Sequence, residues 1–311
     1  MTSTLRGAAH YACENDDISI LSEQIQKATL TASAENVQRV LQTCLKDSAR
    51  RGSTKVMAYL IEQGTDTTQI TGMTLVDTIN GSLPSLETLE VLVEHGWDIN
   101  NRGPGRHADP LLWYLVEDTD LVKWCLAQGA EVDPEDDTPS GARRNRKPIL
   151  ECAAMASSVE VFELLRASGA PVSYGHGILP SAVMSISLHL PLTDGDAESP
   201  QYTRLMAMIR HLVDTVGCDV NSISYGSYYG SGSVCNTPLC WIACHNKRGA
   251  QDLIRFLLDR GGDLDLAGPA DDGYAIPSAR EAAMQHSNTY FLDVVTEWEA
   301  EQQSRTLEHA N

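Results

Sequence analysis

Four soft metal ligands lie close together in the C-terminal third of the sequence. They are Cys235, Cys240, Cys244 and His245, within eleven positions. Thiolate and imidazole ligands of this kind hold zinc in tetrahedral sites. However, Cys240 and Cys244 stand where a small packing residue is typical of a helix, and a free cysteine commonly behaves as a buried apolar group. We expect these residues to serve in packing, with no metal site and no cofactor.

Sequence motifs that mark catalysis are missing. The chain has no Gly-x-Ser-x-Gly nucleophile elbow, no phosphate-binding P-loop and no His-Glu-x-x-His zinc motif. Asp194 and Asp196 resemble the start of a calcium loop, but the remaining ligand positions are lacking. We therefore assign no catalytic residue. A reaction that depends on shape and a few polar groups would leave no motif, so an enzyme stays open as an alternative.

Charge and composition exclude two classes of partner. The 311 residues carry a formal net charge of −19, which disfavours binding to nucleic acid and to anionic lipid. No run approaches the roughly 18 apolar residues that a membrane-spanning helix needs, and the segment from Met1 to Asp17 has no apolar leader.

The eight cysteines are scattered, which favours free thiols in the cytoplasm or nucleus over a disulfide framework.

An internal repeat reveals the elements that would position a site. The repeated segment, which we call the phrase, consists of glycine, a small residue, an acid, an aliphatic residue and then Asn or Asp. A clear copy of it is Gly217-Cys218-Asp219-Val220-Asn221. Copies of the phrase have their glycine at positions 64, 96, 129, 169, 217 and 261. The first intervals are 32 and 33 residues, and the later intervals of 40, 48 and 44 fit the same unit with insertions.

Each glycine follows a stretch with helical periodicity. Apolar residues recur at i, i+3 and i+4 in 56–61, 89–93 and 254–258, the pattern of a half-buried helix. Glycine just past the last turn can adopt the left-handed conformation that ends a helix. A shorter helix rich in small residues precedes each stretch, most clearly at Thr237–Ala243, where Thr caps the helix and Pro fits its first turn.

The pattern resembles the ankyrin-repeat family. Thr237–Ala243 is similar to the family's Thr-Pro-Leu-His-x-Ala-Ala phrase, and a period near 33 is the family's signature. Weaker copies of the phrase lie at Ala9–Cys13, Asp109–Leu112 and Leu150–Ala154. The family's histidine survives at His10, and its replacements elsewhere are Leu112, Glu151 and Cys240. The array is therefore a divergent one.

The resemblance implies a fold. We expect an all-α, ankyrin-type helical repeat solenoid of about eight helix pairs with β-hairpin fingers, formed by residues 1–311 as a single array. Terminal repeats are expected at about 7–30 and 278–298, because the outer face of a cap meets water. We expect the residues after Glu299 to fray.

Three insertions interrupt the later repeats. They cover about 134–147, 184–200 and 222–236, and insertions on one face of a repeat array often form its binding face. The third carries Tyr225, Tyr228 and Tyr229 among glycines and serines, a composition typical of adaptable recognition loops. A plain solvent-exposed loop is the alternative interpretation.

The family also implies where a partner would bind. In that family the residues after the small pair of the inner helix line the concave groove. The candidates at these positions are Arg50, Arg51, Glu117, Met155 and His245. Trp113 and Trp241 fall at equivalent places in their helices, where stacking on a ligand and burial between elements both suit a large aromatic side chain. This mixture of charges predicts no particular ligand.

Two functions fit the sequence. The first is a protein-interaction module or adaptor, a monomer that binds a protein partner through the groove and the inserted fingers. The second is a motif-less enzyme or small-molecule binder, for example a cyclase or isomerase, with a pocket in the concave face. The resemblance favours the first because most ankyrin-repeat proteins are adaptors, although a fold does not settle function. A deep apolar pocket with converging His245, Tyr225 or Glu117 would favour the second.

Overall fold

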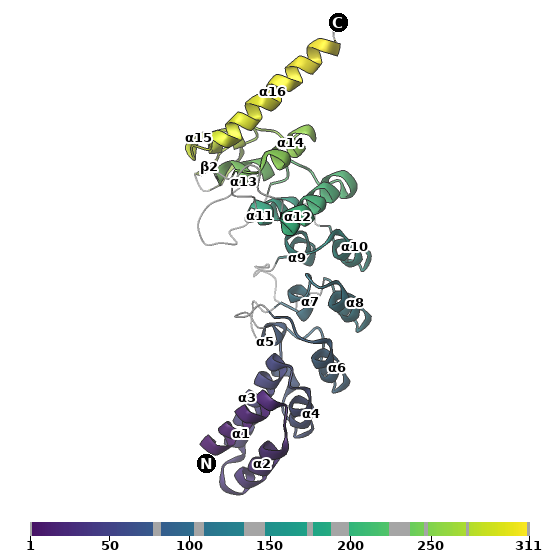
Figure 1. Ribbon diagram of the computed structural model, residues 1–311, viewed down its shortest axis with the longest axis vertical. Helices are drawn as coiled ribbons and strands as arrows, with labels where there is room; N and C mark the ends of the chain where they lie inside the picture. The colour runs from purple at the N-terminus through teal and green to yellow at the C-terminus, as the bar shows by residue number, and fades with distance from the viewer. Residues whose placement is uncertain are drawn as a thin grey trace. The chain divides into compact units, whose positions relative to one another are not determined.

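The computed structural model describes the chain over nine stretches. They are residues 2–76, 82–102, 109–133, 147–172, 177–187, 199–223, 237–245, 248–271 and 274–309. Their regular structure is helical apart from an antiparallel ladder between β1 (Gly268–Asp271) and β2 (Tyr274–Ile276), which follows α14 in Figure 1, and a single bridge residue at Ser82. The residues fall into two compact units, Met1–Pro134 and Glu135–Asn311, and the boundary lies at the start of the first predicted insertion.

Local capping chemistry sets where helices begin. Thr237 accepts a hydrogen bond from the backbone N–H of Cys240, and Pro238 occupies the first turn. The predicted cap and proline of this helix are therefore confirmed. Side chains that accept a backbone N–H in the same way at other helix starts are Ser33, Ser85, Asp118, Ser158, Ser199 and Ser278.

In the first unit, inner helices alternate with outer helices along the chain. The inner helices are α1 (Thr2–Asn15), α3 (Ala34–Arg51), α5 (Gly72–Leu75) and α7 (Leu111–Tyr114). The outer helices are α2 (Ser19–Thr31), α4 (Thr54–Glu62), α6 (Leu86–Glu94) and α8 (Thr119–Ala127). Successive inner helices contact one another, as do α4 and α6. Fully buried leucines such as Leu45, Leu60 and Leu89 fill the space between the helices.

The second unit repeats this arrangement (Figure 1). Its inner helices are α9 (Ile149–Ala156), α11 (Ile178–Ser187), α13 (Pro238–Cys244) and α15 (Ala279–Gln285). Its outer helices are α10 (Val159–Ala167), α12 (Pro200–His211) with the π-helical turn η2 (Leu212–Val216), α14 (Gln251–Asp259) and α16 (Thr289–His309). The inner helices again contact one another in chain order. Phe162 and Phe291 are fully buried between the layers.

Glycines close the outer helices as the sequence predicts. All six predicted closing glycines have positive φ, from 80° to 99°: Gly64, Gly96, Gly129, Gly169, Gly217 and Gly261. At Gly129 a Cβ would meet nothing within 4 Å. The requirement there is therefore the left-handed backbone itself, which side-chain-bearing residues rarely adopt, and not a lack of space.

Side-chain amides join two of the closing turns to the next one along the chain. Asn221 donates from Nδ2 to the carbonyl of Gly261 at 3.0 Å and accepts from the N–H of Asp263 at 2.8 Å. Asn100 makes the same pair of bonds to Gly129 and Glu131, at 3.1 and 2.9 Å. Each bridge satisfies one carbonyl and one N–H of a neighbouring turn.

The predicted β-hairpin fingers are wrong as a repeated feature of the fold. In the described residues, the connections after Gly64, Gly96 and Gly217 are turns, irregular backbone and the 3₁₀ segment η1 (Thr67–Gln69), without paired strands. Side chains satisfy several backbone groups in these connections. Asp219 accepts the N–H of Asn221 in a local turn, and the amide bridges take up further backbone groups.

Two other sequence boundaries also need correction. Residues 184–187, assigned to the second insertion, form the last turn of α11. The segment after Glu299, expected to fray, continues α16 to His309. Arg255 holds this extension, because its guanidinium donates to Glu301 at 2.9 Å and to Glu297 at 3.3 Å. The sequence did not predict these bonds, because Arg255 belongs to α14, a different helix more than 40 positions before its partners.

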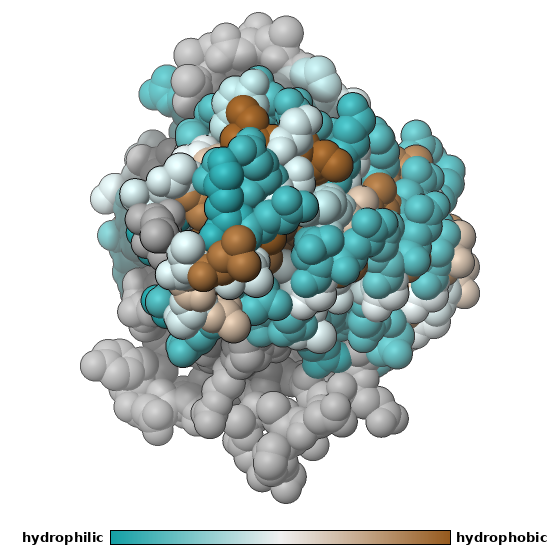
Figure 2. All heavy atoms as spheres, turned by 90° about the horizontal axis from the view of Figure 1, so that it is seen from below, coloured by the Kyte–Doolittle hydropathy of each residue, from teal (hydrophilic) through white to brown (hydrophobic). Residues whose placement is uncertain are grey.

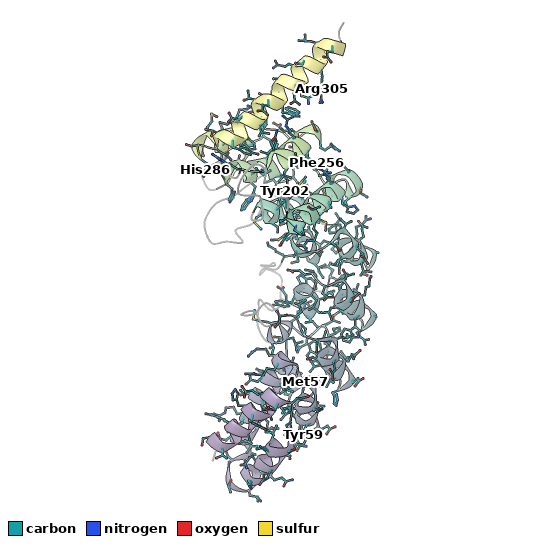
Figure 3. All side chains as sticks on the ribbon, in the orientation of Figure 1. Met57, Tyr59, Tyr202, Phe256, His286 and Arg305 are labelled. Atoms are coloured by element: carbon teal, nitrogen blue, oxygen red, sulfur yellow. The ribbon has the colours of Figure 1, made fainter. Side chains whose placement is uncertain are left out.

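Charged groups also tie the outer helices of the second unit. Arg260 pairs with Asp214 of η2 at 2.9 Å. Its guanidinium lies 4.8 Å from the ring centroid of Phe256, which is labelled in Figure 3. A cation over an aromatic face adds an attraction to that ion pair. These contacts connect η2 to α14.

The outer face of α1 and α2 is mostly polar. Figure 2 views this end of the first unit and shows a largely hydrophilic surface with separate hydrophobic patches. The exposed apolar side chains on these two helices and their connection are Tyr11, Ile18, Ile20 and Leu30. A polar outer face is typical of a terminal repeat, and the two helices cover the range 7–30 that the sequence assigns to a cap.

Replacing Gly129 with Val should destabilise the first unit by about 1 kcal/mol or more, because a β-branched residue is forced to positive φ. Gly7→Val is the matched control, because Gly7 lies in α1 without positive φ and a Cβ there would meet nothing within 4 Å. Urea unfolding followed by circular dichroism measures both variants. If Gly129→Val and the parent are equally stable, the left-handed backbone at position 129 does not require glycine.

Removing the amide bridge should weaken the second unit. Asn221→Ala loses both bonds to the next turn, and we expect a cost of about 1 kcal/mol, the typical net value of a hydrogen bond. Gln285→Ala is the control, because this exposed amide on α15 makes no bridge of this kind within the described residues. The midpoint of urea unfolding reports the difference. A loss of the same size in Gln285→Ala would contradict the assignment.

Candidate functional site

The inner helices of the second unit share one sequence register. Ile149-Leu150 of α9 aligns with Ile178-Leu179 of α11, which places Met184 at the position of Met155. The same position holds Cys244 in α13 and Met284 in α15. A sulfur-bearing side chain therefore recurs on four successive inner helices. We call Met155, Met184, Cys244 and Met284 the sulfur stripe.

Buried small residues fix the direction of the stripe. The two residues before each of its members are almost fully buried: Ala153-Ala154, Ala182-Val183, Ile242-Ala243 and Ala282-Ala283. Six of these eight residues are alanines, which allow the neighbouring inner helices to approach closely. Because each following residue is turned by the same angle around its helix, the four sulfur-bearing side chains lie on the same side of the row.

The stripe is partly open to solvent. Met284 is 58% exposed, and the other three members are half-buried. Lys147 Nζ lies 3.1 Å from the sulfur of Met155, while Ser185 donates to the carbonyl of Met155 at 2.7 Å. Methionine side chains are flexible and polarisable, and surfaces that bind varied apolar partners use them often.

An aromatic pair adjoins the stripe on α13. The rings of Trp241 and His245 are 4.3 Å apart at 31°. His245 Nδ1 donates to the carbonyl of Trp241 at 2.7 Å, because a carbonyl can only accept. This bond fixes the imidazole against the indole at the end of the helix. Both side chains are half-buried, so part of this rigid aromatic pair is accessible, and Trp241 is a binding candidate on that ground.

A buried acid lies on the same helix as Met155. Glu151 is 3% exposed and accepts a hydrogen bond from Ser181 of α11 at 3.3 Å. Burial raises the pKa of its carboxyl to about 7, against the opposing effects of Lys147 and the Ser181 bond. The carboxyl thus changes charge near neutral pH, inside the contact between α9 and α11.

The structure places the predicted residues of the first unit differently. Arg50 and Arg51 end α3 and are exposed, with Arg50 3.6 Å from Asp47. Glu117 is exposed just beyond α7. Trp113 is 6% exposed, so it is a core residue of its unit, and no face of its ring is open for stacking on a ligand. These residues belong to the first unit, whereas Met155, Trp241 and His245 belong to the second.

Several predicted residues lie outside the described part of the chain. They are Tyr225, Tyr228, Tyr229 and Cys235, together with most of the three insertions. Cys240 is buried and bonds to the carbonyl of Pro277 at 3.5 Å. Among the residues that the structure describes, no group of three His, Cys, Asp or Glu side chains could hold a metal ion.

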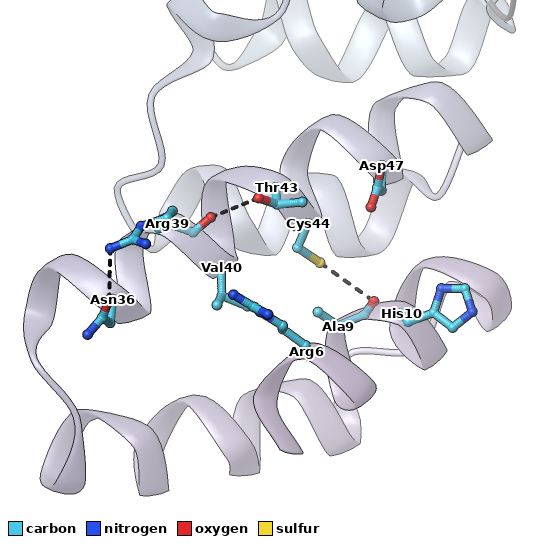
Figure 4. A pocket seen from close by; sticks show the side chains of 9 residues that line it. All are labelled: Arg6, Ala9, His10, Asn36, Arg39, Val40, Thr43, Cys44 and Asp47. Carbon is cyan, nitrogen blue, oxygen red and sulfur yellow. Dashed lines mark hydrogen bonds between the residues drawn. The ribbon is translucent and has the colours of Figure 1, made fainter. Parts of the chain in front are cut away.

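The first unit contains a pocket between α1 and α3 (Figure 4). Its volume is about 450 Å³ and its lining residues are Arg6, Ala9, His10, Asn36, Arg39, Val40, Thr43, Cys44 and Asp47. The size suits a small molecule. The lining mixes apolar with polar and charged side chains, however, and contains none of the predicted binding residues. It is not the deep apolar pocket that an enzyme with converging His245, Tyr225 or Glu117 would need.

Comparison with known proteins adds no family. The chain matches no protein-family model, and no curated protein sequence matches it. Within the described helices, none combines the length and apolar character needed to cross a bilayer.

The sequence contained signals for two features that were missed. The Ile-Leu-x-x-Ala-x-Met spacing of α9 recurs in α11 and would have added Met184 to the stripe. The acid at the family's histidine position, Glu151, follows two apolar residues in a short helix, which is a signal of burial. Its partner Ser181 was not predictable from local spacing, because it is 30 residues away.

The pKa of Glu151 predicts a pH-dependent stability. The carboxyl has its usual value near 4.5 when unfolded and about 7 when folded. The folded state therefore binds more protons between these values, and stability falls as pH rises through that window. Glu151→Gln should remove this loss and exceed the parent at pH 8 by roughly 2–3 kcal/mol.

Glu160→Gln on α10 is the matched control, because this glutamate is exposed. Urea unfolding at pH 5 and pH 8 gives the difference between each variant and the parent. If the parent and Glu151→Gln lose the same stability between the two pH values, the buried acid is not the cause.

Proposed function

We propose that the chain is a protein-interaction module that binds the apolar face of a basic, amphipathic helix from a partner protein. The sulfur stripe carries this proposal. Four adjacent inner helices present thioether or thiol groups at one register, and such side chains adapt their shape to an apolar partner. A helix laid across successive repeats would contact several members of the stripe at once.

Charge supports a basic partner. The net charge of −19 attracts cationic proteins and speeds their encounter. Trp241 and His245 supply a rigid aromatic anchor, the type of group that dominates binding energy at many interfaces. The resemblance to ankyrin-repeat proteins adds support by analogy of fold. The module would act as a monomer in the cytoplasm or nucleus, where its thiols stay reduced.

The first unit offers weaker support for the alternative of a small-molecule binder or enzyme. Its pocket has a suitable volume, yet the cations at its wall, Arg6 and Arg39, are exposed, and exposed charges contribute little binding energy. The sulfur stripe, by contrast, combines apolar character with an accessible surface. We therefore place recognition on the second unit.

Binding of a synthetic helix tests the proposal. A fluorescent peptide with leucines on one face and lysines on the other should bind, and the same peptide with glutamates in place of lysines should not. Met284→Asn should weaken binding of the lysine peptide roughly fivefold or more, because it removes about 1 kcal/mol of apolar burial without a change of charge. Fluorescence anisotropy gives the Kd values.

Met73→Asn is the matched control. Met73 lies on α5 in the first unit and is 57% exposed, almost the same as Met284 at 58%. We expect its Kd to equal that of the parent. Equal losses in both variants, or tight binding of the glutamate peptide, would show that the stripe is not the recognition surface.

A further inference from the structure

Two cysteines of the first unit have their sulfur atoms in contact. Cys13 of α1 and Cys44 of α3 are 31 positions apart, and their Sγ atoms lie 3.4 Å from each other. Both residues are almost fully buried, at 3% and 2% exposure. The two helices pack directly against each other, so the contact is built into the first inner-helix pair.

Hydrogen bonds hold the two thiols in this orientation. Cys13 Sγ lies 3.5 Å from the carbonyl of Cys44, and Cys44 Sγ lies 3.7 Å from the carbonyl of Ala9. The bond between the thiols lowers the pKa of Cys13 and raises that of Cys44, which burial raises further. Cys13 is therefore the better nucleophile of the pair, because the thiolate is the reactive form.

A route from solvent reaches the pair. Cys44 and Ala9 line the pocket between α1 and α3, and Figure 4 shows the bond from the Cys44 thiol to the Ala9 carbonyl at its wall. A pocket of about 450 Å³ admits a molecule as small as a peroxide. A peroxide beside Cys44 is also close to Cys13, since the two sulfurs are in contact.

We propose that Cys13 and Cys44 are a modification site at which hydrogen peroxide joins the two sulfurs in a reversible disulfide. The Cys13 thiolate attacks one peroxide oxygen, the O–O bond breaks, and the departing hydroxide takes up the proton released by Cys13 to become water. Cys13 is then a sulfenic acid. The sulfur of Cys44 attacks the sulfur of Cys13, and the hydroxyl group leaves with the Cys44 proton as a second water.

The disulfide would change the first unit in a measurable way. Its sulfur atoms are about 2.05 Å apart, so the pair must close by a little more than an ångström, which side-chain rotation and a small shift of α1 can supply. The bond would link α1 to α3 around α2. Because a cross-link restricts the unfolded chain, it should stabilise this end of the protein.

Oxidation of the full chain by hydrogen peroxide tests the proposal. Peptide mass mapping should show Cys13 and Cys44 cross-linked, with the loss of two hydrogen atoms. The melting temperature of the oxidised protein should rise by roughly 5 °C or more and return after treatment with dithiothreitol. Sulfoxide at Met284, which is 58% exposed, verifies in the same sample that the oxidant was delivered.

Single-cysteine variants identify the pair. Cys13→Ser should lose both the cross-link and the reductant-reversible shift, and Cys44→Ala serves the same purpose if Cys13→Ser fails to fold. Cys125→Ser should keep both, because burial raises the pKa of Cys125 to about 12 and leaves it an unreactive thiol of the same unit. Three results would overturn the proposal: unchanged thiols once Met284 is oxidised, added oxygen without a cross-link, or a cross-link to another cysteine.

Discussion

The repeated structure depends on how each closing turn satisfies its backbone groups. A glycine in the left-handed region ends the outer helix, and at four of the six closing glycines an aspartate two residues later accepts a backbone N–H and organises the next turn. In two copies, the asparagine at the end of the repeated segment, Asn100 or Asn221, also bonds to a carbonyl and an N–H of the following turn. The bridged carbonyl and N–H groups lie at exposed turns, so without these bonds they would be left to water.

The same register position has different chemistry in the two units. In the first unit it holds Glu14 and Arg50, which are charged and exposed, and Val116, which is apolar but only 4% exposed. In the second it holds the four members of the sulfur stripe. Packing explains the small residues that precede it in both units, but packing does not require sulfur at an accessible position. This difference is the physical basis for assigning recognition to the second unit.

Sequence reasoning succeeded where the cause is local. The closing glycines were predictable because few other residues adopt positive φ, and the Thr237 cap was predictable because the cap and the proline of the first turn are adjacent in one short phrase. It failed where the cause is distant. Arg255 of another helix forms ion pairs with α16, burial against α11 raises the pKa of Glu151, and the Cys13–Cys44 contact joins positions 31 apart.

The amide bridge also tolerates changes in chain length. Asn100 reaches Gly129 across 29 positions, whereas Asn221 reaches Gly261 across 40, and the two bonds are 3.1 and 3.0 Å long. The additional residues between Asn221 and Gly261 leave the hydrogen bonds between the two turns unchanged, because the asparagine side chain bonds only to backbone groups of the turn. Loops in this protein can therefore lengthen, shorten or diverge over evolution without disturbing the helical layers, so new surface segments can be acquired at little structural cost.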